Sequence, residues 1–193
     1  MKYYTFYTIK DASVNTSMFY EIDSGTGVYS PSSAIRHLTC KECNKYEERK
    51  AFDLLATRSF QITPKHDHFV TFDGWRVVSN KFKEIVDRVA PKLVSWYPIG
   101  EKKLNLFFGS IQYLAKCKDE TLLTRSNLCS LCGRYENILE GDAPMDFTDH
   151  PEIIGLPFEN RFCSSPRWLV SERIKEYLEA TNISNIEFHQ YMM

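Results

Sequence analysis

Two stretches of the chain have the apolar spacing of an amphipathic helix. In the first, apolar side chains recur at positions i, i+3, i+4 and i+7, which places them on one helical face. These residues are Phe82, Ile85, Val86 and Val89. In the second stretch, the apolar face consists of Ile174, Tyr177 and Leu178. Ser79 and Ser171 precede the two helices, where a serine hydroxyl can cap the first turn.

Short runs of aromatic and β-branched residues predict strands on both sides of these helices. The predicted strands lie at residues 2–9, 18–22, 75–78, 93–99, 135–140 and 183–191. A hairpin with strands at 104–108 and 111–116 is expected to turn at Gly109-Ser110. Residues 141–167 contain four of the eight prolines and predict a long surface loop, with Ile153, Ile154, Leu156 and Phe158 as apolar anchors. The whole pattern predicts an α+β fold.

The sequences around the two helices resemble each other. VVSNKFKEIV at 77–86 aligns with LVSERIKEYL at 169–178, and the two capping serines are 92 residues apart. A CxxC pair precedes each stretch, and the two pairs are 89 residues apart. This order predicts an internal duplication, with two similar α/β halves at 1–100 and 101–193 inside one compact unit of residues 1–193. Chance similarity between two amphipathic helices is the alternative.

The two CxxC pairs predict a metal site. They consist of Cys40, Cys43, Cys129 and Cys132. A CxxC on a tight turn directs two sulfurs at one point, and two such turns supply the four soft ligands of a structural zinc site. Asn44 and Gly133 follow the pairs, and both suit the positive φ that such a turn needs. We expect one structural Zn²⁺ in a zinc-ribbon-like site that joins the two halves.

Two other uses of the cysteine pairs stay open, namely structural disulfides and a thioredoxin-like redox motif. The start of the chain has no apolar core and cleavage site typical of a signal peptide, which indicates a cytoplasmic location. Disulfides are rare in a reducing cytosol. No run of 18 apolar residues is present, so no membrane span is expected.

The charge of the chain is balanced, with 24 basic and 25 acidic residues. A net charge of −1 argues against a protein held to nucleic acid through phosphate contacts, although a local basic patch stays compatible with it. The sequence has no phosphate-binding glycine loop, no GxSxG and no HExxH. We therefore expect a protein that is not an enzyme.

His66-Asp67-His68 is the one remaining candidate for metal or acid–base chemistry. On a strand, His66 and His68 would share one face. The simpler interpretation is a polar strand end beside Phe69.

We call the two CxxC turns, at residues 40–43 and 129–132, knuckles; the second ends Cys-Gly. The two knuckles and the closing segment WLVSERIKEYLEATNISNIEFHQY together resemble the double-CXXCG motif proteins. This family consists of immunity proteins from bacterial polymorphic toxin systems. The chain departs from the family pattern at Asn44, where the family has Gly. The resemblance implies a cytosolic, non-enzymatic protein that binds and neutralises one cognate toxin. It also implies that Cys40, Cys43, Cys129 and Cys132 are zinc ligands with a scaffold role.

The sequence is compatible with three functions. The first is toxin neutralisation, with an acidic contact surface in the 141–167 loop if the toxin is basic; its candidate residues are Asp142, Asp146, Asp149, Glu152 and Glu159. The second is a zinc-ribbon protein that binds nucleic acid or acts in transcription, supported by basic residues near the first helix; these are Arg76, Lys81, Lys83, Arg88 and Lys92. The third is a hydrolase that uses residues 66–68.

Overall fold

The computed structural model describes residues 5–10, 13–14, 20–22, 29–32, 35–46, 50–51, 54, 66–71, 75–100, 104–139, 143–147, 152–156 and 167–191. In this part of the chain, strands that pair mostly antiparallel accompany two α-helices, so the expected α+β class is confirmed.

All strands but β2 in the first of the two larger sheets follow the CxxC pair at residues 40–43 in the chain. Its strands, in spatial order, are β2 (Ser13–Val14), β5 (His68–Thr71), β6 (Arg76–Ser79), β8 (Leu106–Ile111) and β7 (Val94–Pro98). Only β2 runs parallel to its neighbour, β5. Helix α2 (Asn80–Val89) connects β6 to β7.

The second sheet has a similar arrangement. Its strands, in spatial order, are β13 (Ile153–Leu156), β14 (Arg167–Ser171), β1 (Phe6–Lys10) and β15 (Glu187–Tyr191). All of them pair antiparallel, and helix α3 (Glu172–Ala180) connects β14 to β15. The strand that leads into each helix is therefore flanked in the same way in both sheets. The strand between the two that each helix connects is β8 in the first sheet and β1 in the second, so the sheets do not divide the chain at residue 100.

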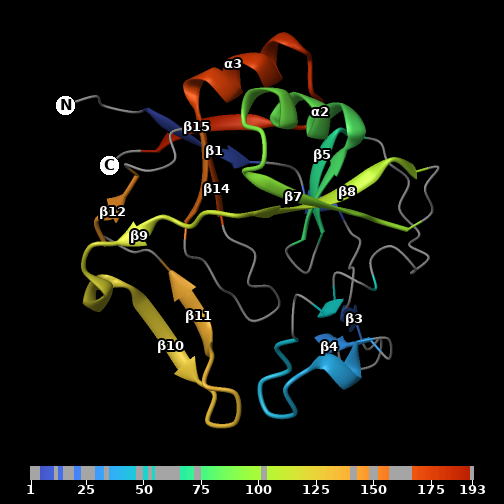
Figure 1. Ribbon diagram of the computed structural model, residues 1–193. Coiled ribbons are helices and arrows are strands. Elements are labelled where there is room, and N and C mark those ends of the chain that lie inside the picture. The colour runs from blue at the N-terminus through green and yellow to red at the C-terminus, as the bar shows by residue number, and fades with distance from the viewer. Residues whose placement is uncertain are drawn as a thin grey trace.

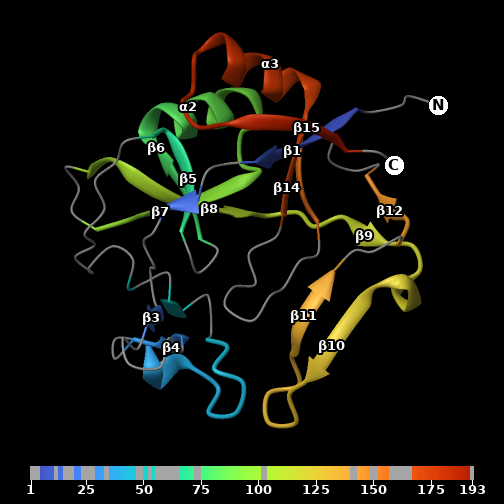
Figure 2. The same cartoon turned by 180° about the vertical axis from the view of Figure 1, so that it is seen from behind.

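Both helices lie on the same side of the molecule and contact each other (Figures 1 and 2). Each is capped as predicted, because the hydroxyl of Ser79 accepts from Phe82 N and that of Ser171 accepts from Ile174 N, both at 3.3 Å. The helices and the two sheets share one buried cluster, whose largest members include Phe82, Ile85, Trp168, Ile174 and Leu178.

The opposite faces of the two sheets form separate cores, since successive residues of a strand point to opposite faces. Val78 packs under the helices, whereas Val77 packs with Trp75 and Phe108 on the far side of the first sheet. In the second sheet, Val170 faces the helices and Leu169 faces a third cluster. This alternation explains why β6 and β14 are apolar at consecutive positions.

Short elements surround the two sheets. Three two-stranded ribbons pair β3 (Tyr20–Ile22) with β4 (Tyr29–Pro31), β9 (Lys116–Cys117) with β12 (Met145–Asp146), and β10 (Thr124–Leu128) with β11 (Tyr135–Leu139). Among the described residues, 3₁₀ turns lie at Arg36–Leu38 and Glu120–Leu122. In Figures 1 and 2 the β10–β11 ribbon extends away from the helices, toward the loop of the first knuckle.

The predicted hairpin at Gly109-Ser110 is wrong. Residues 106–111 form one strand, β8, which pairs with β6 and β7 on its two sides. Gly109 serves packing there, since a Cβ atom at this position would lie 2.7 Å from ring atoms of both Trp96 and Trp168. The sequence alone does not distinguish a glycine that allows two indole rings to pack from a glycine that forms a turn.

The predicted loop at 141–167 is also wrong in part, because Ile153–Leu156 form the fully buried strand β13. A four-residue apolar run beside Pro and charged residues is compatible with a buried strand.

Tyr177, expected on the apolar face of its helix, is 44% exposed. The predicted last strand begins four residues later than expected, at Glu187. Of the predicted strand at residues 18–22, the structure describes Tyr20–Ile22, which form β3.

Candidate metal centre

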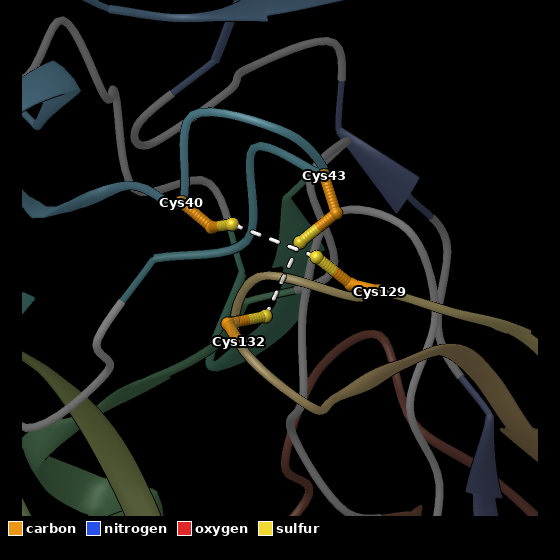
Figure 3. A group of neighbouring side chains, drawn as sticks. All are labelled: Cys40, Cys43, Cys129 and Cys132. Carbon is orange, nitrogen blue, oxygen red and sulfur yellow. Dashed lines mark hydrogen bonds between the residues drawn. The ribbon is translucent and has the colours of Figure 1, made fainter.

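The structure brings the four cysteines of the two CxxC pairs together (Figure 3). Their sulfur atoms all lie within 4.8 Å of one another. Across the two pairs, Cys40 Sγ lies 3.7 Å from Cys129 Sγ, and Cys43 Sγ lies 3.6 Å from Cys132 Sγ. These distances are far longer than the ~2.0 Å of a disulfide. They match the edge of roughly 3.8 Å of a tetrahedron with Zn–S distances of ~2.3 Å.

The first pair lies on a tight turn. Cys40 N donates to Lys45 O at 2.8 Å, and Asn44 N donates to Cys40 O at 2.9 Å. Asn44 has φ 59°, as expected for the residue after the second cysteine. Tyr46, which closes the turn by pairing with Thr39, is buried and stacks on Trp75 with ring centroids 5.7 Å apart. The first knuckle is thus attached to the core of the first sheet.

The second pair repeats this turn 89 residues later. Cys129 N donates to Arg134 O, and Gly133 N donates to Cys129 O, both at 2.9 Å. Gly133 has φ 68°, which confirms the second backbone expectation. The turn joins β10 to β11, and Leu128 pairs with Tyr135 at the base of the turn. The second knuckle is therefore the tip of the β10–β11 ribbon.

Backbone N–H groups are directed at the sulfurs in both knuckles. Those of Cys43 and Glu42 bond Cys40, and the pKa of the Cys40 thiol is lowered as a result. In the second knuckle the N–H of Arg134 acts on Cys132, whose pKa falls to about 6. Such bonds stabilise thiolates, which are the form that binds metal.

The other two thiols titrate higher. Burial raises the pKa of Cys43. For Cys129, the N–H of Cys132 lowers the pKa, but burial and the bond to the Glu42 carboxylate oppose it, and the pKa stands at about 12. The four sulfurs interact too closely to ionise independently in the absence of a cation. A divalent cation among them would favour thiolates at all four positions.

These residues fit a tetrahedral metal ion. The donor set is four sulfurs, two of their separations match the edge of a tetrahedral site, and the N–H groups that point at sulfur are the partners that bound thiolates use. Among the residues that the structure describes, no other group of three or more His, Cys, Asp or Glu side chains converges in this way. Cys117 lies apart from the cluster, and Cys163 lies outside the described residues.

The structure does not assemble residues 66–68 into a second site. His66 is exposed, whereas His68 is fully buried and stacks on Phe82. Nε2 of His68 lies 2.6 Å from Nη1 of Arg76, and burial, together with the Arg76 charge, holds the pKa of His68 well below its usual range. A guanidinium at this distance occupies the position that a metal ion would need.

Asp67, between the two histidines, has a structural role. Its carboxylate accepts a hydrogen bond from the Ser79 hydroxyl at 2.7 Å and two from Ser184 at 3.1 Å. Burial raises the pKa of Asp67, but these bonds and the charge of Lys81 outweigh it, so the pKa is lowered overall. Asp67 thus ties the cap of α2 to the segment after α3.

Two of the five predicted acidic contact residues lie in the described chain. Glu152 precedes β13 and accepts a 2.7 Å hydrogen bond from the Ser171 hydroxyl. It also pairs with Arg173 at 3.4 Å, so its carboxylate is used within the chain. Asp146 lies in β12 opposite Lys116. The other three, Asp142, Asp149 and Glu159, lie outside the described residues.

The basic residues near the first helix do not form one exposed patch. Arg76 is buried against His68 and above the Trp168 ring. Lys83 pairs with Asp87 at 2.8 Å. The positive charges singled out in the sequence are therefore partly used in packing and in pairing.

Two residues of the candidate metal centre, Glu42 and Arg134, were not predicted from the sequence. Both lie inside or beside a knuckle, and both bond the opposite knuckle. Glu in a CxxC spacer and Arg after Cys-Gly look like surface charges, and the sequence carries no signal of their partners.

The sequence matches no family model and no curated protein. Within the described chain, neither helix has the length and apolar character needed to cross a bilayer.

Proposed function

We propose that this protein is an immunity protein that binds and neutralises one cognate bacterial toxin, and that a structural Zn²⁺ stabilises it. The observation that supports this proposal best is the convergence of Cys40, Cys43, Cys129 and Cys132, whose sulfurs lie within 4.8 Å of one another. The two CxxC motifs that supply them also carry the resemblance to the double-CXXCG immunity proteins.

The proposed zinc site has a scaffold role. Four cysteine ligands complete a tetrahedral coordination and leave no position for water, so the site would bind the two knuckles and not perform hydrolysis. It would connect residue 40 to residue 132 and thereby attach the tip of the β10–β11 ribbon to the core of the first sheet. Cross-linking over such a span removes conformational entropy from the unfolded chain.

We also propose that the chain contains two similar α/β halves that arose by duplication. Strand β6 pairs through Ser79 with Leu106, and β14 pairs through Ser171 with Phe6, so the capping serine has the same register in both sheets. The carboxylates of Asp67 and Glu152 bond these two serines in the same way. The knuckles repeat the same turn hydrogen bonds at a constant separation of 89 residues.

The proposed partner is a protein toxin met in the cytoplasm, and the contact surface would be acidic if the toxin is basic. Asp146 and the three acidic residues outside the described chain are its candidate members. Glu152 is a weaker candidate, because Ser171 and Arg173 already bond its carboxylate.

Co-expression tests this function directly. The chain is produced together with the product of the adjacent gene in a host whose growth that product stops, and growth and copurification are measured. The proposal expects restored growth and a copurified complex. A matched pair, Cys132→Ser and Cys117→Ser, separates the role of the metal centre from that of a cysteine outside it. Absence of protection with well-folded wild-type protein contradicts the toxin proposal and leaves the metal proposal unaffected.

A further inference from the structure

The β10–β11 ribbon has little apolar packing to hold it in place. No residue of β10 or β11 belongs to the three buried clusters of the described chain. Leu128 is 59% exposed and Leu131, in the second knuckle, is 64% exposed. An isolated two-stranded hairpin is marginally stable in water. Contacts at its tip must therefore determine where the second knuckle lies.

Arg134 supplies one such contact. Its guanidinium donates from Nη1 to Tyr46 O at 2.9 Å and from Nη2 to Lys45 O at 2.8 Å. Both acceptors belong to the backbone that closes the first knuckle. The planar fork of an arginine holds two neighbouring carbonyls in a fixed geometry, which a lysine cannot do.

Glu42 supplies the reciprocal contact. Its carboxylate, in the spacer of the first CxxC, accepts from the Ser130 hydroxyl and from Leu131 N, both at 3.0 Å, and from Cys129 Sγ at 3.2 Å. The first two donors are not candidate metal ligands. The bonds from Ser130 and Leu131 to Glu42 therefore do not depend on a proton at Cys129.

The two contacts are specific to this chain and do not follow from the knuckle turn itself. With the separation of 89 residues, Glu42 corresponds to Leu131, and Lys45 corresponds to Arg134. The turn hydrogen bonds repeat at both knuckles, but the side chains that cross between them differ. Each knuckle thus provides one charged side chain to the backbone of the other.

We infer that Arg134 and Glu42 are positioning residues that hold the two knuckles together before any metal binds, so that four sulfurs are presented as one preformed site. This inference rests on the metal site proposed above. Residues that support metal ligands without touching the ion typically change metal affinity by 10–100-fold when replaced. We expect a loss of that size for Arg134→Ala.

Cobalt binding to the metal-free full chain tests this inference. The visible absorption of tetrahedral thiolate-bound Co²⁺ is titrated in competition with a chelator, for the wild type, Arg134→Ala and Arg134→Lys. Arg125→Ala is the matched control, since Arg125 lies on the same ribbon but bonds Glu120. We expect about a 10–100-fold weaker affinity in Arg134→Ala, incomplete recovery in Arg134→Lys, and no change in Arg125→Ala.

A second pair of variants separates positioning from general stability. Glu42→Gln keeps an oxygen that accepts from Ser130 and Leu131, so it is expected to retain more affinity than Glu42→Ala. Denaturant unfolding of all metal-free variants is expected to stay close to that of the wild type, because the side chains of Arg134 and Glu42 belong to none of the three buried clusters. If the wild type binds no cobalt, the metal proposal itself fails. Tight cobalt binding by the wild type with equal affinity in Arg134→Ala overturns this inference alone.

Discussion

The hydroxyl of Ser171 donates a 2.7 Å hydrogen bond to the carboxylate of Glu152 while it accepts from the N–H of Ile174. Ser171 therefore caps α3 and connects the start of this helix to Glu152, the residue before β13. Ser79 makes the same pair of bonds with Asp67 and Phe82 at α2. The two helix starts are built alike, although Asp67 and Glu152 have different side-chain lengths.

Ser171→Ala is expected to lower the free energy of unfolding by about 1–2 kcal/mol, because it removes a cap and one partner of a carboxylate. Urea unfolding measures this change. Thr124→Ala, on the exposed start of the β10–β11 ribbon, is the control and is expected to change stability by less than ~0.5 kcal/mol. Equal effects of the two substitutions would contradict a specific contribution of the Ser171 cap to the free energy of unfolding.

Gly109→Ala is expected to destabilise the protein by about 1–3 kcal/mol, because the new methyl group overlaps the rings of Trp96 and Trp168. Thermal unfolding measures the loss. Gly133 provides the contrast, since its φ is positive but no atom lies within 4 Å of an added Cβ. Gly133→Asn should therefore be tolerated, as Asn44 occupies the equivalent turn position at φ 59°. A neutral Gly109→Ala would contradict the packing explanation.

The buried His68 predicts a dependence of stability on pH. Burial and the nearby Arg76 lower the pKa of His68 in the folded protein well below the ordinary value of 6.5, which applies to the unfolded chain. Between these folded and unfolded pKa values, only the unfolded chain binds the proton. The contribution of His68 to stability is therefore present above pH 6.5 and is lost as the pH falls below it. The expected loss is about 1 kcal/mol between pH 7.5 and pH 5.5.

Urea unfolding at the two pH values, with His68→Gln as the reference, measures this term. The variant lacks the titrating ring, so the difference in unfolding free energy between wild type and variant should shrink toward the lower pH. A difference that stays constant with pH would mean that folding does not shift the pKa of His68.

The parts of the fold that follow from local pattern were predictable from the sequence. Phe82, Ile85, Val86 and Val89 face the core of α2 as their spacing requires, and both capping serines occupy their expected positions. Asn44 and Gly133 have the positive φ that a CxxC turn demands. In these cases the residue type and its neighbours along the chain determine the conformation.

The wrong or missing predictions concern residues whose conformation or partners are determined by other residues far away in the sequence. Gly109 looks like a turn glycine until Trp96 and Trp168 lie on either side of it. Ile153–Leu156 become a buried strand because β14 offers a partner. Glu42 and Arg134 have partners in the opposite knuckle, 87 to 89 residues away along the chain. No local pattern reports such contacts.

The metal content of purified protein is the most direct test of the proposed four-cysteine zinc site. The chain is produced without added metal, and bound metal is quantified for the wild type, Cys132→Ser and Cys117→Ser. We expect one zinc per chain in the wild type and in Cys117→Ser, and its loss in Cys132→Ser. Wild-type protein without metal, or equal zinc in all three proteins, would contradict a site formed by Cys40, Cys43, Cys129 and Cys132.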